Sequence, residues 1–473
     1  MNTKKTIFSL SLLLAVTFLS SAQGNNDGYF ASENAYHSLN FSQTNPVLGT
    51  ARYSGMAGAM GAFGGDASTM KDNPAGLGIY RSSDISITPN LYIANDNSVG
   101  FNVNNFGIIL NFRNSGLQKG YITSSLGISY NRLKNFSRYS NLADNNLGYS
   151  LTDSMLSHAP IYLSGIASNV ELIDETGSLF PGERIGNQIR YTEEGGIGEW
   201  DLSYGINISN RFYFGISAGF VNLDYKLKTM YDEQDAGNPM EQWNLDTYYE
   251  ASGSGFNLKL GVIAHITDFL RAGLAFHTPT FYSIDEYTIE KISYKYNDEA
   301  ESFFAPKLQT PLRLQGSLGF IIEKRAIIGL EYQFENFSAM RFSSDRMLNQ
   351  PTKDLINGEM RISHTAKIGA EVKVIEGLSL RAGFAFASAP SIKLSENIYT
   401  DEANFQAYPL DQPQNTFYYT GGIGYKKKAF YADLAYVHQV KKERFFEYLP
   451  QEAGPYDLTL HNNNIMMTLG YRF

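Results

Sequence analysis

Cysteine is absent from the 473 residues of this chain, so it has no disulfide framework and no thiolate metal site. Long apolar runs are also missing, because no stretch of about eighteen apolar residues occurs after Leu19. A helix needs about 20 such residues to cross a bilayer, and a helical membrane protein is therefore excluded. Burial and backbone pairing must hold the fold together.

The first residues have the order of an export signal. Lys4 and Lys5 precede an apolar run from Ile7 to Leu19, and the small residues 20–22 suit cleavage before Gln23. At 1.5 Å per residue, this thirteen-residue run is too short to cross the ~30 Å hydrocarbon core as a helix. We predict a signal peptide over residues 1–22.

Basic residues are outnumbered by acidic ones. Removing Lys4 and Lys5 with the signal leaves 36 basic against 47 acidic residues, a net charge of about −11. Phosphate backbones are bound by clustered cations, so we expect no nucleic-acid partner.

Aromatic residues are plentiful, with 32 Tyr and 31 Phe, yet the mean hydropathy is only −0.26 because apolar and polar residues alternate. Alternation with a period of two predicts β-strands. In the last segment, Ile465, Met467, Leu469, Tyr471 and Phe473 share one face. We predict fourteen strands, near residues 84–93, 101–113, 121–133, 199–209, 211–227, 243–265, 269–284, 308–322, 325–341, 360–374, 378–390, 415–426, 428–442 and 461–473.

The connections between these strands alternate in length. Turns of a few residues, such as Asn210 and 375–377, alternate with longer loops, such as 134–198 and 391–414. Short turns on one side and long loops on the other are typical of a bacterial outer-membrane barrel, whereas a soluble β-sandwich has no reason to sort its loops. We therefore predict an all-β, fourteen-stranded antiparallel transmembrane barrel over residues 82–473, with its short turns in the periplasm. In the long loop 134–198, the stretch 147–170 predicts some helix at the mouth.

Several residue types fit a barrel in lipid. Tyr and Phe are expected at both membrane interfaces, and strand glycines permit curvature or leave room in the lumen. Tyr471 and Phe473 resemble the C-terminal aromatic signal that barrel-assembly machinery reads. The cluster 426–428 of three lysines is interpreted as a solvated turn.

Residues 23–81 do not alternate and hold the densest glycine cluster of the chain. A phosphate-binding loop would need a Gly-Lys-Ser/Thr ending between a strand and a helix, and this segment has neither. Its glycines are Gly49, Gly55, Gly58, Gly61, Gly64, Gly65, Gly76 and Gly78.

The stretch from Gly49 to Gly78 resembles the N-terminal hatch of FadL-like transporters of hydrophobic compounds, and Asn73-Pro74-Ala75 is the core of the match. The resemblance implies that residues 23–81 form a hatch that plugs the barrel. It further implies gating roles for Gly55, Gly58 and Asp66 beside the Asn73-Pro74-Ala75 motif.

By the same resemblance, the chain is a monomeric outer-membrane channel surrounded by lipid and lipopolysaccharide. It would take up long-chain fatty acids or similar apolar compounds passively, with hatch movement and lateral exit. No cofactor is expected.

Two alternatives, a haem receptor and a polar-solute porin, stay open, and enzymatic activity is not expected. A haem receptor would need one of seven scattered histidines (His37, His158, His265, His277, His364, His438 and His461) as an axial ligand. A polar-solute porin would have an open polar lumen. An enzyme would need an oriented nucleophile, and the Gly-x-Ser-x-Gly motif around Ser217 lies inside an alternating strand without the required elbow.

Overall fold

The computed structural model describes residues 31, 33–113, 119–147, 150–152, 161–174, 177–180, 185–235, 238–323, 325–344, 349–391, 412–445 and 456–473. The predicted signal peptide, residues 1–22, lies outside this part of the chain. None of the helices within it is long and apolar enough to cross a bilayer, a criterion that does not apply to strands.

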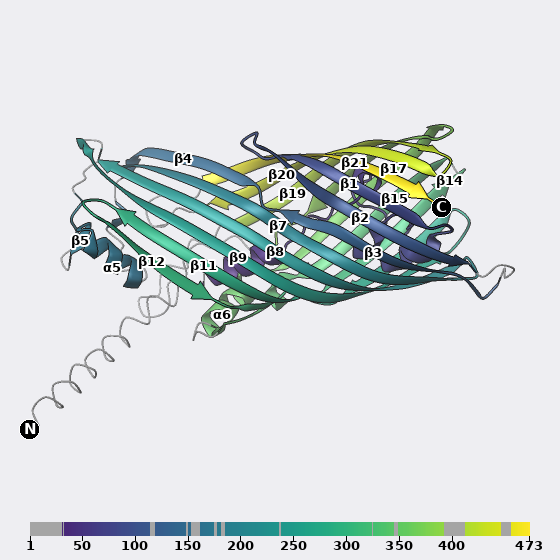
Figure 1. Ribbon diagram of the computed structural model, residues 1–473, viewed down its shortest axis with the longest axis horizontal. Helices are drawn as coiled ribbons and strands as arrows, with labels where there is room; N and C mark the ends of the chain where they lie inside the picture. The colour runs from purple at the N-terminus through teal and green to yellow at the C-terminus, as the bar shows by residue number, and fades with distance from the viewer. Residues whose placement is uncertain are drawn as a thin grey trace, which may run out of the picture.

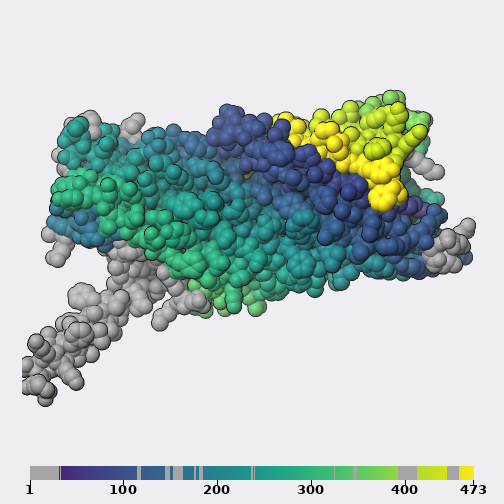
Figure 2. Space-filling view, in the orientation of Figure 1, coloured from purple at the N-terminus to yellow at the C-terminus, as the bar shows by residue number. Residues whose placement is uncertain are grey.

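Fourteen antiparallel strands close into a barrel, as predicted (Figure 1). Closure occurs because β1 pairs on one side with β2 and on the other with the last strand, β21, from Asp84↔Arg472 to Ile93↔Asn463. In Figure 2, the C-terminal strand in yellow lies directly beside the dark blue β1. Lipid cannot satisfy free backbone groups, so closure is what allows a sheet to stand in a membrane.

Some of the fourteen strands are built from consecutive pieces. They are β1 (Asp84–Ile93), β2 (Val99–Arg113), β3 (Tyr121–Asn135) with β4 (Arg138–Leu147), β7 (Ile185–Ile208), β8 (Phe212–Asp235), β9 (Asn238–His265), β10 (Leu270–His277) with β11 (Phe281–Ser293), β12 (Asn297–Phe304) with β13 (Lys307–Gln309) and β14 (Arg313–Ile322), β15 (Ala326–Asn336) with β16 (Arg341–Ser343), β17 (Ile362–Ile375), β18 (Leu378–Ala387), β19 (Gln412–Lys427), β20 (Phe430–Phe445) and β21 (Tyr456–Arg472). The other elements are α2 (Ala51–Gly55), α3 (Thr69–Asp72), η1 (Pro74–Ile79), α5 (Ile161–Asn169), β5 (Ile173–Asp174), β6 (Gly177–Ser178), η2 (Phe337–Ala339) and α6 (Asn349–Glu359).

The barrel has a short-turn end and a long-loop end. At the short-turn end, β7 and β8 are joined through Ser209 and Asn210, which both have positive φ, and Gly377 (φ 82°) joins β17 to β18. At the long-loop end, β4, α5 and β12 extend the wall outward (Figure 1). The longest strand, β9, has 28 residues, whereas ~9–11 tilted residues cross a bilayer.

Along the long strands, the apolar residues change from the outer face of the barrel to its inner face. Near the short-turn end of β7, the apolar Trp200 and Leu202 face outward and are about half exposed, while Asp201 faces inward and is 1% exposed. Near its long-loop end, Ile189 and Tyr191 are buried inside. Apolar residues outside fit contact with lipid, and apolar residues inside fit a barrel in water. The switch therefore marks the edge of the lipid-facing band.

The strands at the long-loop end are longer than predicted. The strand predicted to start at 199 starts at Ile185, and much of the predicted loop 134–198 belongs to β3, β4 and β7. That loop also contains α5, within the stretch predicted to hold a helix. The predicted loop 285–307 is mostly the rest of β11 and β12, and the predicted loop 342–359 contains the end of β16 and α6. These extensions have the inverted, soluble-like pattern, which is not the pattern of a lipid-facing strand.

The wall is interrupted in neighbouring strands. The strand made of β10 and β11 breaks at residues 278–280, and its neighbour breaks between β13 and β14 at residues 310–312. Pro279 and Pro311 lie in these breaks and cannot donate to a sheet ladder. Thr280 and Thr310 still bridge the two pieces, with a 3.0 Å hydrogen bond from Thr310 N to Thr280 O. We call this region the wall break.

Candidate functional site: the lumen and its N-terminal segment

The N-terminal segment, defined as residues 33–80, lies inside the barrel against inward-facing strand residues (Figure 1). It starts with a helix over 33–42 and continues through α2, α3 and η1. Thr50 caps α2, because its side chain accepts a hydrogen bond from Tyr53 N. Most of its residues are buried.

The Asn73-Pro74-Ala75 motif forms a rigid turn at the start of η1. Asn73 Oδ1 accepts a hydrogen bond from Ala75 N at 3.2 Å, and Pro74 occupies the first helical turn, where its missing N–H costs nothing. Asn73 Nδ2 donates to Gly61 O at 2.8 Å and thereby ties two parts of the segment together. Asn73 is 1% exposed.

Rows of strand glycines form the seat of this segment. Gly205, Gly215 and Gly261 are register neighbours on β7, β8 and β9. A Cβ at Gly215 or Gly261 would overlap the Pro74 carbonyl or the Asn73 side chain. A second row meets residues 56–63 of the segment, and it consists of Gly319, Gly329, Gly369 and Gly383. The strands lack side chains where the segment's backbone approaches them.

The other predicted gating residues fall in two places. Asp66 accepts from Thr50 Oγ1 at 2.8 and 2.9 Å and from Ser68 N at 2.9 Å, so it fixes the N-terminus of α2. Gly58 has φ of +74°, a conformation that side chains disfavour. Gly55 packs instead toward Gly422 of the wall. Neither Asp66, Gly55 nor Gly58 contacts the Asn73 turn through a hydrogen bond that joins described residues.

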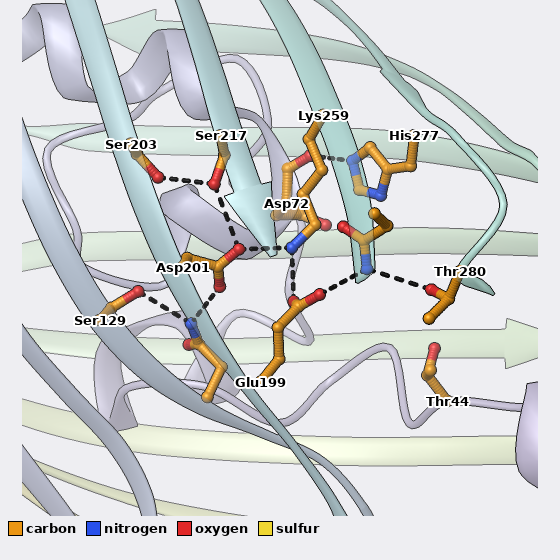
Figure 3. Close-up of polar contacts among 12 residues, drawn as sticks. Thr44, Asp72, Ser129, Glu199, Asp201, Ser203, Ser217, Lys259, His277 and Thr280 are labelled. Atoms are coloured by element: carbon orange, nitrogen blue, oxygen red, sulfur yellow. Dashed lines mark hydrogen bonds and ion pairs between the residues drawn. The ribbon is translucent and has the colours of Figure 1, made fainter. Parts of the chain in front are cut away.

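A buried charge cluster lies on the wall beside the segment (Figure 3). Lys259 Nζ is paired with Glu199 and, at 2.5 Å, with Asp201. Asp201 also accepts from Ser217 Oγ at 3.2 Å. Next to this cluster, His277 Nε2 is 2.7 Å from the backbone oxygen of Asp72 in α3. One ammonium thus faces two carboxylates, and amide donors complete the set: Asn131 Nδ2 donates to Asp201 at 3.0 Å and Asn257 Nδ2 to Glu199 at 2.8 Å.

Two further charge pairs hold the segment. Gly61 N donates to Glu331 at 3.0 Å, and Glu331 is paired with Lys367 at 2.7 Å. Arg52 donates two hydrogen bonds to Glu371, at 2.8 and 3.1 Å. Glu371 is also bound by Arg381, which bridges to Asp433 at 2.6 Å. The strand register decides which of these inward charges meet, so the sequence pattern alone could not predict the pairs.

Toward the long-loop end, the lumen becomes apolar. The helix 33–42 inserts Phe41 into a cluster with Phe136 and Tyr225. His37 stacks on Tyr249, with ring centroids 4.3 Å apart and planes within 3°. Burial lowers the pKa of His37 to about 3, so the ring is neutral. Beyond this cluster, α5 and the strand extensions enclose a second apolar core around Trp243.

The segment separates two cavities. The first, which we call the amide cavity, has a volume of about 120 Å³ and lies between residues 40–46 and the wall toward the long-loop end. The second, which we call the vestibule, has a volume of about 720 Å³ and opens at the short-turn end. Seven cationic and four acidic side chains line the vestibule, among them Arg52, Lys373, Lys426 and Lys428. The predicted solvated turn 426–428 thus borders this cationic space.

A third, smaller cavity of about 60 Å³ lies just inside the wall break. Thr278, Thr280 and Pro311 of the break line it together with Phe41 and Lys259. It shares Thr44, Asn45 and Gln333 with the amide cavity, so the two are neighbours.

The residues named for the alternative functions do not converge. Ser217 is fully buried and donates to Asp201 from within β8. Among the described residues, no group of three His, Asp or Glu side chains could hold a metal ion. His158 lies outside the described part of the chain. Tyr471 and Phe473 face outward and are 38% and 60% exposed.

Comparison with solved structures identifies proteins of similar fold. No protein-family model and no curated protein matches the sequence. Solved structures of similar fold include the P. putida toluene transporter TodX (12% identity, 90% of this chain and 99% of that chain, TM-score 0.54). The Ralstonia pickettii toluene transporter TbuX (15%, 91% and 99%, 0.53) and a Pseudomonas aeruginosa FadL homologue (11%, 91% and 99%, 0.55) are further examples. The predicted resemblance to FadL-like barrels is confirmed at the level of the fold.

Proposed function

We propose that this chain is an outer-membrane channel for the passive uptake of hydrophobic small molecules, with the N-terminal segment as its hatch. The long-loop end faces the outside and the short-turn end the periplasm. The observation that carries the proposal is the inverted lumen. Apolar side chains fill its outer half around Phe41 and Trp243, where a porin with an open polar pore would have none.

The route through the barrel follows from where apolar surface is available. Beneath the apolar outer half, the hatch and the charge clusters around Lys259 and Glu371 block straight passage, because an apolar molecule gains nothing from a polar, charged lumen. The wall break offers a sideways exit. Outward residues that flank it are apolar, including Phe276, Phe281 and Leu312, so the break opens onto lipid.

A few contacts hold the hatch in place and would have to break for it to move. The helix 33–42 carries the apolar cluster that a ligand would replace, and Leu39 packs with Ile356 of α6 at the side of the wall. Arg52, Gly61 and the Asp72 backbone hold the rest of the segment to the charge clusters. We therefore propose that residues 33–46 move first and that the Asn73 turn stays seated until a ligand reaches it.

A cross-link across the wall break tests the exit. Thr280 N donates to Thr310 Oγ1 at 2.8 Å, and the chain has no native cysteine, so Thr280→Cys with Thr310→Cys forms one defined pair. We expect uptake of a radiolabelled hydrophobic compound to stop under oxidising conditions and to return with reductant. Each single cysteine variant serves as the control. Unimpaired uptake by the oxidised pair would refute the lateral route.

Among the described residues, no contact supports the porin or the haem-receptor alternative. The lumen is filled by the segment rather than open as in a porin, and planar-bilayer recordings of the folded barrel should be nearly silent. For haem, the two histidines beside the hatch are engaged: His37 is stacked between rings and His277 is bound to Asp72 O. A third inward histidine, His265, lies against the Tyr213 ring near the short-turn end. Titration with haem should leave the absorption spectrum unchanged.

A further inference from the structure

The amide cavity has an unusual lining for a channel whose solved structural neighbours carry toluene. Nine amide and eight hydroxyl side chains line it, against three cationic and two acidic ones. Its volume of about 120 Å³ has room for on the order of eight water-sized groups. A small polar group fits this space, and an apolar chain end would meet mostly hydrogen-bonding side chains.

Most of the charges around the cavity are paired within the protein, and Lys134 is held by uncharged groups. Arg138 is 3.3 Å from Glu443, which is also paired with Lys441. Glu335 is paired with Arg313 at 2.9 Å. Lys134 Nζ donates to the Asn40 side chain at 2.7 Å, and Glu193 accepts from two tyrosine hydroxyls. A carboxylate entering the cavity would have to displace an acidic partner from Arg138, Lys441 or Arg313, or displace the two Asn40 oxygens from Lys134.

Several uncharged groups remain free for a ligand. In the part of the chain that the structure describes, the side-chain amides of Gln43, Gln414 and Asn462 form no hydrogen bond with another protein group. The same holds for the hydroxyls of Thr365 and Thr416. Such groups line the cavity from the segment on one side and from β17, β19 and β21 on the others.

The cavity is connected to apolar surface in the direction of the exit. Phe136 and Phe337 border the amide cavity itself. The neighbouring cavity continues past Phe41 and Tyr282 to Pro311 in the wall break. A molecule with its polar end among the amides could therefore lay an apolar tail toward lipid.

We propose that the cargo is an amphiphile with an uncharged, hydrogen-bonding head group, such as the hydroxyls of a monoacylglycerol, and that the amide cavity binds this head. The inference rests on the function proposed above and specifies its substrate class. An unsubstituted hydrocarbon would leave the free amides without partners once water is displaced, and each lost hydrogen bond lowers affinity by about tenfold. A carboxylate head would compete with Glu443 and Glu335 for their cations, or with the Asn40 oxygens for Lys134.

Equilibrium dialysis against the full-length barrel in lipid nanodiscs tests this assignment, with empty nanodiscs as background. Three radiolabelled probes share an eight-carbon chain: 1-octanoylglycerol, octanoate and octane. We expect 1-octanoylglycerol to bind at least tenfold more tightly than the other two. The combined Gln43→Leu, Gln414→Leu and Asn462→Leu variant should lose that preference while binding octane as well as the parent does. Gln242→Leu, an exposed amide on β9, is the matched control.

The outcomes separate the two proposals. If octane or octanoate binds as tightly as 1-octanoylglycerol, or if the triple variant keeps the preference, the head-group assignment is overturned while the channel function stands. If none of the probes binds and the parent barrel takes up no radiolabelled hydrophobic compound, the channel function itself fails. Folding of each variant is checked by circular dichroism and by compact migration in unheated detergent gels.

Discussion

The glycine seat of the hatch gives the sharpest test of gating. In Gly205→Ala, the new Cβ would lie 2.6 Å from Leu77 Cβ and 2.7 Å from Gly78 N, both in η1. Ordinary contact begins near 3.4 Å, so η1 and the Asn73 turn must shift by about 0.8 Å. Overpacking of this kind costs about 1–3 kcal/mol. The ratio of seated to unseated hatch should therefore fall by about 5- to 150-fold.

Planar-bilayer recording measures this ratio directly. We expect brief openings in Gly205→Ala, where the parent barrel is nearly silent, and faster uptake of the hydrophobic probe. The matched control is Gly316→Ala on β14, whose Cβ would meet only Leu274 at 3.9 Å. Both variants must fold, since alanine is an ordinary strand residue. Silence in Gly205→Ala equal to that of Gly316→Ala would mean that the seat does not hold the hatch.

Three other perturbations probe neighbouring parts of the mechanism. Replacing Asn73 and Pro74 together with alanine removes the rigid turn and should change uptake severalfold; unchanged uptake by a correctly inserted barrel would defeat the gating role. Burial raises the pKa of Glu359 to about 7, so the packing of α6 is strongest when this carboxyl is protonated and weakens as the pH rises from about 4.5 to about 7. Hydrogen-exchange protection of α6 should then be higher at pH 5 than at pH 8, and a Glu359→Gln variant that still shows the difference would contradict this cause. In a barrel opened by Gly205→Ala, the cationic vestibule should make the pore anion-selective, and Lys373→Gln with Lys426→Gln should reduce the measured permeability ratio for chloride over potassium.

The sequence predicted the wall of this barrel well, because lipid imposes a strict local pattern. On β8, outward Phe214 and Ile216 alternate with inward Gly215 and Ser217, and this alternation is readable without knowledge of any partner strand. Turn positions were equally readable, since Asn210 and Gly377 interrupt the alternation where the chain reverses. Both signals lie within a few residues along the chain.

The lumen could not be predicted in the same way, because its contacts depend on register and closure. Lys259 meets Asp201 only because β9 lies two strands from β7 with a particular offset, and Arg52 meets Glu371 across more than 300 positions of sequence. The glycine rows depend on the strand register in the same way. Gly205 and Gly261 look like isolated strand glycines until pairing aligns them under the Asn73 turn.

The sequence also carries a signal that marks the edge of the lipid-facing band. In β8, the inward positions change from Ser217 to Val221 and Leu223, while the outward positions change from Phe220 to Asn222. Both faces invert at the same point, which locates the edge of the lipid band and predicts an apolar interior beyond it. A pore for polar solutes has no use for such an interior, since water in contact with it is unfavourable. The inversion of the strand pattern, read on β7, β8 and β9 together, therefore argues against an open polar pore independently of the Asn73-Pro74-Ala75 motif.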